Sequence, residues 1–241
     1  MFFENIGVFD SGIGGIPVMH RLAAEFKRAN FIYLGDNGNV PYGRRSAEEI
    51  FELTQNGCEV LKNGGADIIA VACNTASVSW RGGDEYDGVK VFRLVPYIGE
   101  EFKNKKGVFI ATPATVNYCR TNNVFKDCAD LTLTPMPYLA EQIEKKVLYG
   151  EVLGFDDHLV STLDHFDYVY LGCTHYLYLK QAVKSANPKV AILDGIDKMI
   201  DNIRNFCNNT NCVTERKRTI RFIGEYAEHN RKISEQIFGN E

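Results

Sequence analysis

The sequence predicts an α/β protein with two pseudo-symmetric, doubly wound parallel-sheet lobes and an active site in the cleft between them. Three observations lead to this prediction. Short apolar runs alternate with helical patterns, which is typical of parallel sheets covered by helices. Two of these runs end in a cysteine followed by short polar side chains, at Cys73 and Cys173. Several landmarks also recur about 100 residues apart along the chain.

Composition and charge argue against several classes of protein. The 241 residues are 45% hydrophobic and 24% charged, which suits a globular chain large enough for two lobes. A net charge of −4 without a Lys/Arg stripe argues against a nucleic-acid partner. We expect no membrane association, because no apolar run approaches the roughly 20 residues of a membrane span and the first residues do not resemble a signal peptide. Seven cysteines without a Cys-x-x-Cys pair predict reduced thiols and a cytoplasmic location.

The first lobe is predicted to alternate strands with helices. Its glycine-rich turn at 10–15 leaves N–H groups free near a helix start, although the spacing matches neither of the common phosphate-binding patterns. Ser46 and Glu49 form a capping box at the start of the second helix. The predicted strands are 6–9, 31–36, 67–72 and 89–95, the helices are 17–28 and 46–63, and 81–88 is a loop.

The pattern restarts at Gly107 and predicts a second lobe. Gly107-Val108-Phe109 repeats Gly7-Val8-Phe9, and both the strand at 131–134 and Cys173 stand 100 residues after their counterparts. We expect the first lobe to comprise 1–94 plus 196–241 and the second to comprise 95–195. The remaining strands are predicted at 107–109, 131–134, 167–172, 190–193 and 218–224, and the helices at 137–149, 156–164, 176–186, 196–206 and from 225 to 238.

The two cysteines stand at the carboxyl ends of buried strands, where open α/β sheets place their ligand crevices. The amide and hydroxyls of Asn74 and Thr75 can hold a carboxylate or stabilise a thiolate. His175 and Asp10 are placed to hydrogen-bond near the two sulfur atoms. One thiolate and one thiol on opposite faces of a carbon can remove a proton and return it to the other face.

Other interpretations of these cysteines are weaker. A single buried cysteine at a strand end is usually a core residue, but two in matched polar contexts favour chemistry. A metal site is disfavoured, because Cys173 and His175 offer only two close ligands. A phosphatase needs an arginine soon after its cysteine, and Arg81 is eight residues on. A nucleophilic thiol with His175 as base remains open, although it leaves Cys73 without a role.

Four motifs together resemble the glutamate racemase family across nearly the whole chain. They are Asp10-Ser11-Gly12-x-Gly14-Gly15, Pro41-Tyr42-Gly43, Ala72-Cys73-Asn74-Thr75-Ala76-Ser77 and Gly172-Cys173-Thr174-His175-Tyr176. The resemblance implies cofactor-independent interconversion of L- and D-glutamate, which supplies D-glutamate for peptidoglycan. The chain departs from the family after Tyr176, where Leu177-Tyr178 replace the usual Pro-Leu.

The resemblance also implies roles for individual residues. Cys73 and Cys173 are expected to be the two acid/base groups, acting on D- and L-glutamate respectively, with Asp10 and His175 assisting them. No metal is expected, glutamate is the expected small-molecule partner, and a homodimer is the assembly to test. The residues expected to hold the amino acid are Ser11, Tyr42, Gly43, Asn74, Thr75, Thr115, Thr174 and Glu144.

Three alternative functions stay open from the sequence. The nearest is a racemase of aspartate or a related amino acid, which a panel of substrates would separate. A non-catalytic amino-acid-binding relative would bind glutamate without exchanging its α-proton in D₂O. A pyridoxal enzyme would show a visible absorption band in the pure protein.

Overall fold

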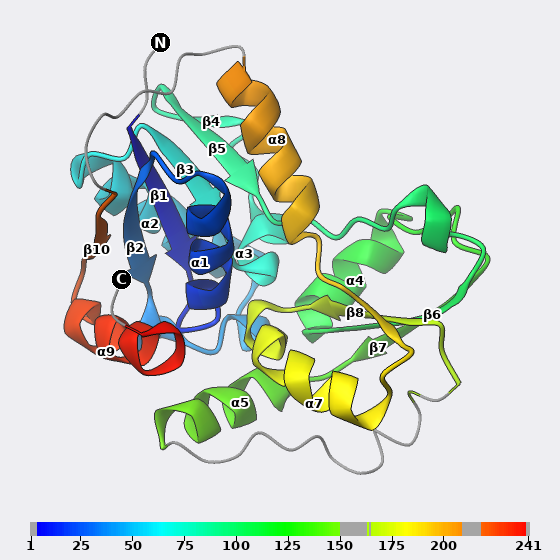
Figure 1. Cartoon of the computed structure of the whole chain (residues 1–241). Helices are drawn as coiled ribbons and strands as arrows, with labels where there is room; N and C mark the ends of the chain where they lie inside the picture. The colour runs from blue at the N-terminus through cyan, green and yellow to red at the C-terminus, as the bar shows by residue number, and fades with distance from the viewer. Residues whose placement is uncertain (1–3, 150–162, 164, 209–217, 240–241) are drawn as a thin grey trace.

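The computed structural model describes residues 4–149, 163, 165–208 and 218–239, and two β-sheets organise them (Figure 1). Each sheet carries its own helices. We call the six-stranded sheet with its helices the first lobe, and the four-stranded sheet with its helices the second lobe. The predicted α/β class with two mostly parallel sheets is confirmed.

The first sheet has the strand order β10-β2-β1-β3-β5-β4. Every neighbouring pair is parallel except β4 and β5, which form a short antiparallel ladder inside the predicted loop 81–88 and its following strand. The strands are β1 (Asn5–Asp10), β2 (Asn30–Gly35), β3 (Ile68–Val71), β4 (Glu85–Tyr86), β5 (Val89–Arg93) and β10 (Ile220–Phe222).

The second sheet is wholly parallel, in the order β7-β6-β8-β9. This order repeats the β2-β1-β3-β5 part of the first sheet, so the two lobes have the similar topology that the sequence landmarks predict. The strands are β6 (Lys106–Ala111), β7 (Asp130–Pro135), β8 (Tyr168–Gly172) and β9 (Ala191–Leu193).

The pairing register corrects one detail of the repeat. The sequence match aligns Gly107 with Gly7, but the ladders align Val108 with that position. Gly7 pairs with Ile32 and Ile69, whereas Val108 pairs with Thr132 and Val169. The offset is therefore 101 residues for the central strand and 100 for its neighbours. As a consequence Ala111, not a carboxylate, occupies the place of Asp10 in the second lobe.

The helices of the first lobe follow from local signals. The capping box of Ser46 and Glu49 is confirmed at the start of α2. Helix α1 begins at Gly15, so Pro17 lies in its first turn. Proline is tolerated there because the N–H groups of the first turn have no acceptor within the helix. The helices are α1 (Gly15–Glu25), α2 (Ala47–Asn63), α3 (Asn74–Ser79), α8 (Ile196–Asn208) and α9 (Ala227–Phe238), with 3₁₀ turns η1 (Asn37–Asn39) and η2 (Tyr42–Arg44).

The second lobe differs most from the prediction after Cys173. The helix expected at 176–186 is divided into a 3₁₀ turn and a shorter α-helix. The helix expected at 156–164 falls almost entirely outside the described residues, which here include only 163. The helical elements are η3 (Glu100–Phe102), α4 (Pro113–Thr121), α5 (Leu139–Leu148), η4 (Thr174–Leu179) and α7 (Lys180–Ala186).

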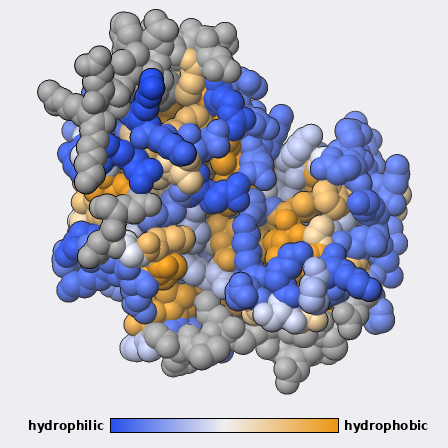
Figure 2. Space-filling model, viewed as in Figure 1, coloured by the Kyte–Doolittle hydropathy of each residue, from blue (hydrophilic) through white to orange (hydrophobic). Residues whose placement is uncertain are grey.

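One apolar core runs through both lobes. Val8 and Tyr33 of the first sheet belong to the same buried cluster as Ile110 and Leu171 of the second. Figure 2 shows a largely hydrophilic outer face, with apolar surface along the junction of the lobes. In the described part of the chain, no helix is both long and apolar enough to cross a bilayer.

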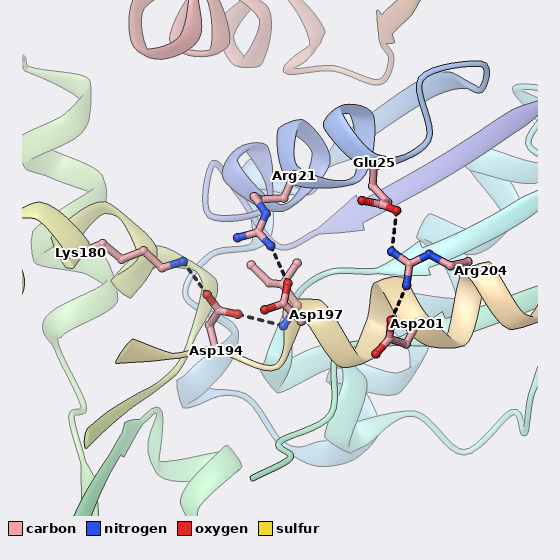
Figure 3. A network of polar contacts seen from close by, with 8 residues as sticks. Arg21, Glu25, Lys180, Asp194, Asp197, Asp201 and Arg204 are labelled. Atoms are coloured by element: carbon pink, nitrogen blue, oxygen red, sulfur yellow. Dashed lines mark hydrogen bonds and ion pairs between the residues drawn. The ribbon is translucent and has the colours of Figure 1, made fainter. Parts of the chain in front are cut away.

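Ion pairs cover the junction where the chain returns from β9 to α8 (Figure 3). Asp194 accepts hydrogen bonds from Lys180 of the second lobe and from the backbone N–H of Ile196, at 2.5 and 2.9 Å. Arg21 of α1 pairs with Asp197, and Arg204 of α8 joins Glu25 to Asp201. Because these last pairs are largely exposed, they orient α8 on α1 more than they stabilise the fold.

Candidate active site

A cavity of about 680 Å³ lies between the lobes at the carboxyl ends of the parallel strands. Both Cys73, which follows β3, and Cys173, which follows β8, line it. Helices α5 and α9 complete its outer wall, and both lie beyond the lower ends of β1 and β2 in Figure 1. Of the residues expected from the sequence, the cavity is lined by Ser11, Tyr42, Gly43, Cys73, Thr75, Glu144, Cys173 and His175.

Cys73 is the N-cap residue of α3 and is only 5% exposed. Its Sγ lies 3.5 Å from the hydroxyl of Ser11 and accepts a hydrogen bond from the backbone N–H of Ala76 at 3.5 Å. Burial, followed by the charge of Asp10, raises the pKa of Cys73 to about 12. Cys73 is therefore a neutral thiol at neutral pH.

Asp10 lies behind this wall and has no exposed surface. Its carboxylate accepts hydrogen bonds from the backbone N–H of Gly12 and from the hydroxyl of Thr174, both at 3.0 Å. Burial raises the pKa of Asp10 to about 6, although the charge of His175 and the bond from Gly12 act against this. Asp10 therefore places a buried negative charge close to Cys73.

His175 gives the opposite wall a different charge. Its Nε2 lies 2.7 Å from the carboxylate of Glu144, which α5 contributes. Burial alone lowers the pKa of His175, but its hydrogen bonds with Cys173 and Glu144, together with the charge of Glu144, raise that pKa well above its usual value. The imidazole is therefore cationic at neutral pH and faces the sulfur of Cys173.

Hydroxyl groups form a chain across the cleft. The hydroxyls of Thr75 and Thr112 are 3.0 Å apart, and that of Thr112 is 3.0 Å from Thr115. Thr112 lines the cavity, whereas Thr115 is fully buried behind it. Thr112 was not expected from the sequence as a cavity residue, although a threonine directly before a proline is a recognisable helix N-cap.

The structure places four of the expected residues behind the cavity lining. Thr115 bonds Thr112, which lines the cavity, whereas Thr174 donates to Asp10 within the layer behind. Asn74 donates a hydrogen bond from Nδ2 to the carbonyl of Leu94 at 3.1 Å, and its buried Oδ1 has no hydrogen-bond partner. The four residues are Asp10, Asn74, Thr115 and Thr174.

The outer rim contains residues that the sequence analysis did not single out. Arg44 of the first lobe reaches Glu141 of α5 at 2.7 Å, and Lys145 bonds the same carboxylate at 3.0 Å. Tyr226, the N-cap residue of α9, and His229 within that helix also line the cavity. Arg44 directly follows the Pro-Tyr-Gly motif and was recognisable, but nothing local connects the distant α9 residues with this cavity.

The described residues contain no group of three or more His, Cys, Asp or Glu side chains that could hold a metal ion. Closest to the two thiols, the described side chains supply the carboxylates of Asp10 and Glu144 and the imidazole of His175. Such groups transfer protons.

No protein-family model matches the chain. A curated glutamate racemase from Clostridium botulinum (strain Kyoto / Type A2) is 30% identical over 230 residues, covering 88% of this chain and 87% of that protein. The glutamate racemase of Aquifex pyrophilus is 34% identical over 209 residues, covering 83% and 82%. Among solved structures, glutamate racemase from Thermus thermophilus in complex with β-chloro-D-alanine superposes with a TM-score of 0.72 at 26% identity, covering 98% of this chain and 93% of that one. With this identity over most of both lengths, and with two cysteines lining the cavity between two α/β lobes, the chain belongs to the glutamate racemase family.

Proposed function

We propose that the protein interconverts L- and D-glutamate by moving the α-proton, without a cofactor. The observation that carries this proposal is that two thiols, at equivalent positions in two lobes, line one cavity. The curated relatives named above are glutamate racemases, which supports glutamate as the substrate. The family relationship also assigns the D-glutamate product to peptidoglycan synthesis.

The proposed mechanism uses one thiolate and one thiol. The thiolate of Cys173 takes the α-proton of L-glutamate, and the electron pair of the broken C–H bond stays on the α-carbon. The thiol of Cys73 then gives its proton to the opposite face of that carbon. Atoms and charge balance, because the product is D-glutamate and the two cysteines have exchanged protonation states. The reverse reaction starts from that exchanged state.

The two neighbouring groups support this division of roles. The cationic His175 stabilises negative charge on the sulfur of Cys173, while burial and Asp10 keep Cys73 protonated. The two cysteines therefore face the same space with neighbours of opposite charge. When Cys73 is the base, the charge of Asp10 makes its thiolate more basic, which helps it to remove a weakly acidic α-proton.

We assign substrate binding to the polar residues around the thiols. Ser11, Tyr42, Gly43, Thr75 and Glu144 face the cavity, and Thr112 presents to it the hydroxyl chain that Thr115 supports. Asn74 and Thr174 lie in the layer behind and hold the cysteine-bearing turns in place. The net charge of −4 does not attract an anionic substrate to the protein. We therefore assign its binding to local hydrogen bonds from these hydroxyls.

We also propose that 1–94 plus 196–241 and 95–195 form the two domains. Limited proteolysis near 95 and 195 would test this division. A cytoplasmic location suits two thiols that must stay reduced. The homodimer would be tested by sedimentation velocity across a range of protein concentrations.

Incubation with single enantiomers in D₂O tests the proposed function. We expect L-glutamate and D-glutamate each to lose the α-proton signal in NMR and to approach zero optical rotation, whereas L-aspartate changes at least about tenfold more slowly. Faster reaction with aspartate would favour the aspartate racemase alternative. Binding of glutamate without deuterium exchange would identify a non-catalytic relative.

A further inference from the structure

The turn from Ser11 to Gly14, called here the Ser11–Gly14 loop, is held by two tyrosine hydroxyls on adjacent carbonyl groups. Tyr33 of β2 donates to the carbonyl of Gly12 at 2.6 Å. Tyr178 of η4 donates to the carbonyl of Ile13 at 2.8 Å. Tyr33 belongs to the same lobe as the loop, whereas Tyr178 belongs to the other one. The same loop is therefore fixed once within its lobe and once across the cleft.

The loop packs closely against the second lobe at this point. A side chain at Gly14 would place its Cβ 2.6 Å from the Thr174 hydroxyl oxygen and 2.7 Å from Nδ1 of His175. Only glycine fits that separation, so any opening of the lobes must first lift the loop from the turn that follows Cys173. The loop also carries the Ser11 hydroxyl that contacts Cys73. Its position therefore links the surroundings of the two thiols.

Three hydroxyl contacts between described residues join the lobes around the cavity. Two of them involve groups of the site itself, namely Thr174 with Asp10 and Thr75 with Thr112. The third, from Tyr178 to Ile13, differs because neither residue lines the cavity. Burial and the nearby charges of Asp10 and Glu144 raise the pKa of Tyr178 well above its usual value, so its phenol keeps the proton that it donates.

We propose that Tyr178 is an interlobe tether. Its hydroxyl holds the Ser11–Gly14 loop on the second lobe and favours the closed arrangement in which Cys73 and Cys173 line one cavity. Tyr178 is a positioning residue, since its hydroxyl bonds the backbone of Ile13 and its side chain does not line the cavity. A tether of this kind acts before substrate arrives, because it increases the fraction of molecules that are already closed.

The expected size of the effect follows from the strength of one hydrogen bond. Losing a single intramolecular bond changes an equilibrium by about 2- to 10-fold. If only the closed form binds substrate productively, the apparent dissociation constant rises by the factor by which the closed fraction falls. Bound substrate then holds the lobes together, so turnover at saturation changes little.

Thiol alkylation in the absence of substrate tests the tether directly. Wild type, Tyr178→Phe and Tyr33→Phe are treated with iodoacetamide, and labelling of each cysteine is followed by peptide mass spectrometry. We expect Cys73 and Cys173 to be labelled about 2- to 10-fold faster in Tyr178→Phe. In Tyr33→Phe, which removes the bond within the lobe, Cys173 should stay within about twofold of wild type.

Two buried cysteines serve as internal controls. Cys58 lies in the core of the first lobe and Cys119 in that of the second, and both are at most 2% exposed. Neither should be labelled faster in Tyr178→Phe. Unchanged labelling of Cys73 and Cys173, equal acceleration of Cys173 in Tyr33→Phe, or parallel acceleration of Cys58 and Cys119 would each overturn the tether.

Steady-state kinetics supply a second readout, which rests on the proposed function. L- and D-glutamate have equal free energies, so kcat/KM must be equal in the two directions for every variant. The rise of the open fraction and the fall of the closed fraction multiply to the change of the equilibrium, so a threefold rise in labelling leaves a rise in KM of no more than about threefold. We expect that rise in KM of Tyr178→Phe to be equal for the two enantiomers, with kcat within twofold of wild type. A fall in kcat in one direction alone would contradict the proposal, because it would assign Tyr178 to the chemistry of one wall. If wild type does not racemise glutamate, the proposed function fails while the alkylation result still decides the tether.

Discussion

The two walls of the cavity are built on the same strand order but carry opposite charges. The wall of Cys73 has Asp10 behind it, and the wall of Cys173 has a cationic His175 beside it. The cysteines occupy equivalent positions after β3 and β8. The difference between the walls therefore comes from their neighbours, and it leaves one thiol protonated while the other faces a cation.

The source of this difference is visible in the backbone. The one-residue shift of β6 places Ala111 where the first lobe has Asp10. After the cysteines, the first lobe continues with the helix α3 and the second with the 3₁₀ turn η4, which carries His175 into the cavity. A repeated fold can thus bring two cysteines to one cavity, and small departures from the repeat can give them neighbours of opposite charge.

Removing either thiol should have the largest effect on this comparison. In the proposed mechanism each wall handles the proton on one face, so Cys73→Ala and Cys173→Ala should each lower kcat/KM for racemisation by about 10²- to 10⁴-fold or more. Each variant should still exchange the α-proton of one enantiomer in D₂O, since one base remains. Polarimetry and NMR of the separate enantiomers measure the two effects.

Cys58→Ala is the matched control for these variants. Cys58 is a fully buried thiol of the first lobe that does not line the cavity. We expect this variant to lose a little stability while it keeps racemising glutamate. Near-normal turnover in Cys73→Ala or Cys173→Ala would disprove the two-base mechanism.

Asp10→Asn should separate activity from stability. The folded pKa of Asp10 is raised from 3.8 to about 6, so its stabilising contribution is full below pH 3.8 and is lost as pH rises through about 6. At pH 7.5 the ionised carboxylate costs up to about 3 kcal/mol, which an asparagine would not incur. We therefore expect Asp10→Asn to lower kcat/KM by about 10- to 100-fold and to unfold at a higher temperature than wild type.

The pH dependence of unfolding checks this interpretation. The stability difference between Asp10→Asn and wild type should shrink between pH 7.5 and pH 4.5, because wild-type Asp10 takes up its proton in that range. Urea titrations at the two pH values measure it. A variant that is less stable than wild type at pH 7.5 would show that the hydrogen bonds of Asp10 outweigh the cost of its burial.

Glu144→Gln should change the charge beside Cys173. Without this carboxylate, the pKa of His175 falls, and the imidazole loses its proton at a lower pH. Because the proposed mechanism needs cationic His175, the alkaline limb of the kcat/KM profile should move to lower pH, with a loss of about 10-fold near neutrality. Glu141→Gln is the control, since Glu141 lies on the same helix but pairs with Arg44 and Lys145. An identical shift in both variants would exclude a specific role for Glu144.

The sequence predicted the two cysteines and their lobes better than the other residues that line the cavity. Cys73, Cys173 and the capping box were recognisable because their signals are local, and the second lobe because strands repeat. It was not recognisable that Thr112 lines the cavity while Thr115 lies behind it, since this depends on how the first turn of α4 is oriented toward the cavity. The cavity residues of α9 were beyond any local pattern, because β10 must first return the chain to the edge of the first sheet. The tether of Tyr178 likewise requires both lobes in place.

The ion pair at the cavity rim should have the smallest effect on racemisation, because it lies beside neither cysteine. Arg44 and Glu141 join the lobes at the cavity mouth, but the side chains are 49% and 34% exposed, where a single ion pair contributes at most about 1 kcal/mol. Arg44→Gln should therefore raise KM for both enantiomers by no more than about 5-fold and leave kcat unchanged. Added salt should erase the difference, since it screens exposed charges. A salt-independent loss of kcat would instead show that Arg44 contacts the substrate.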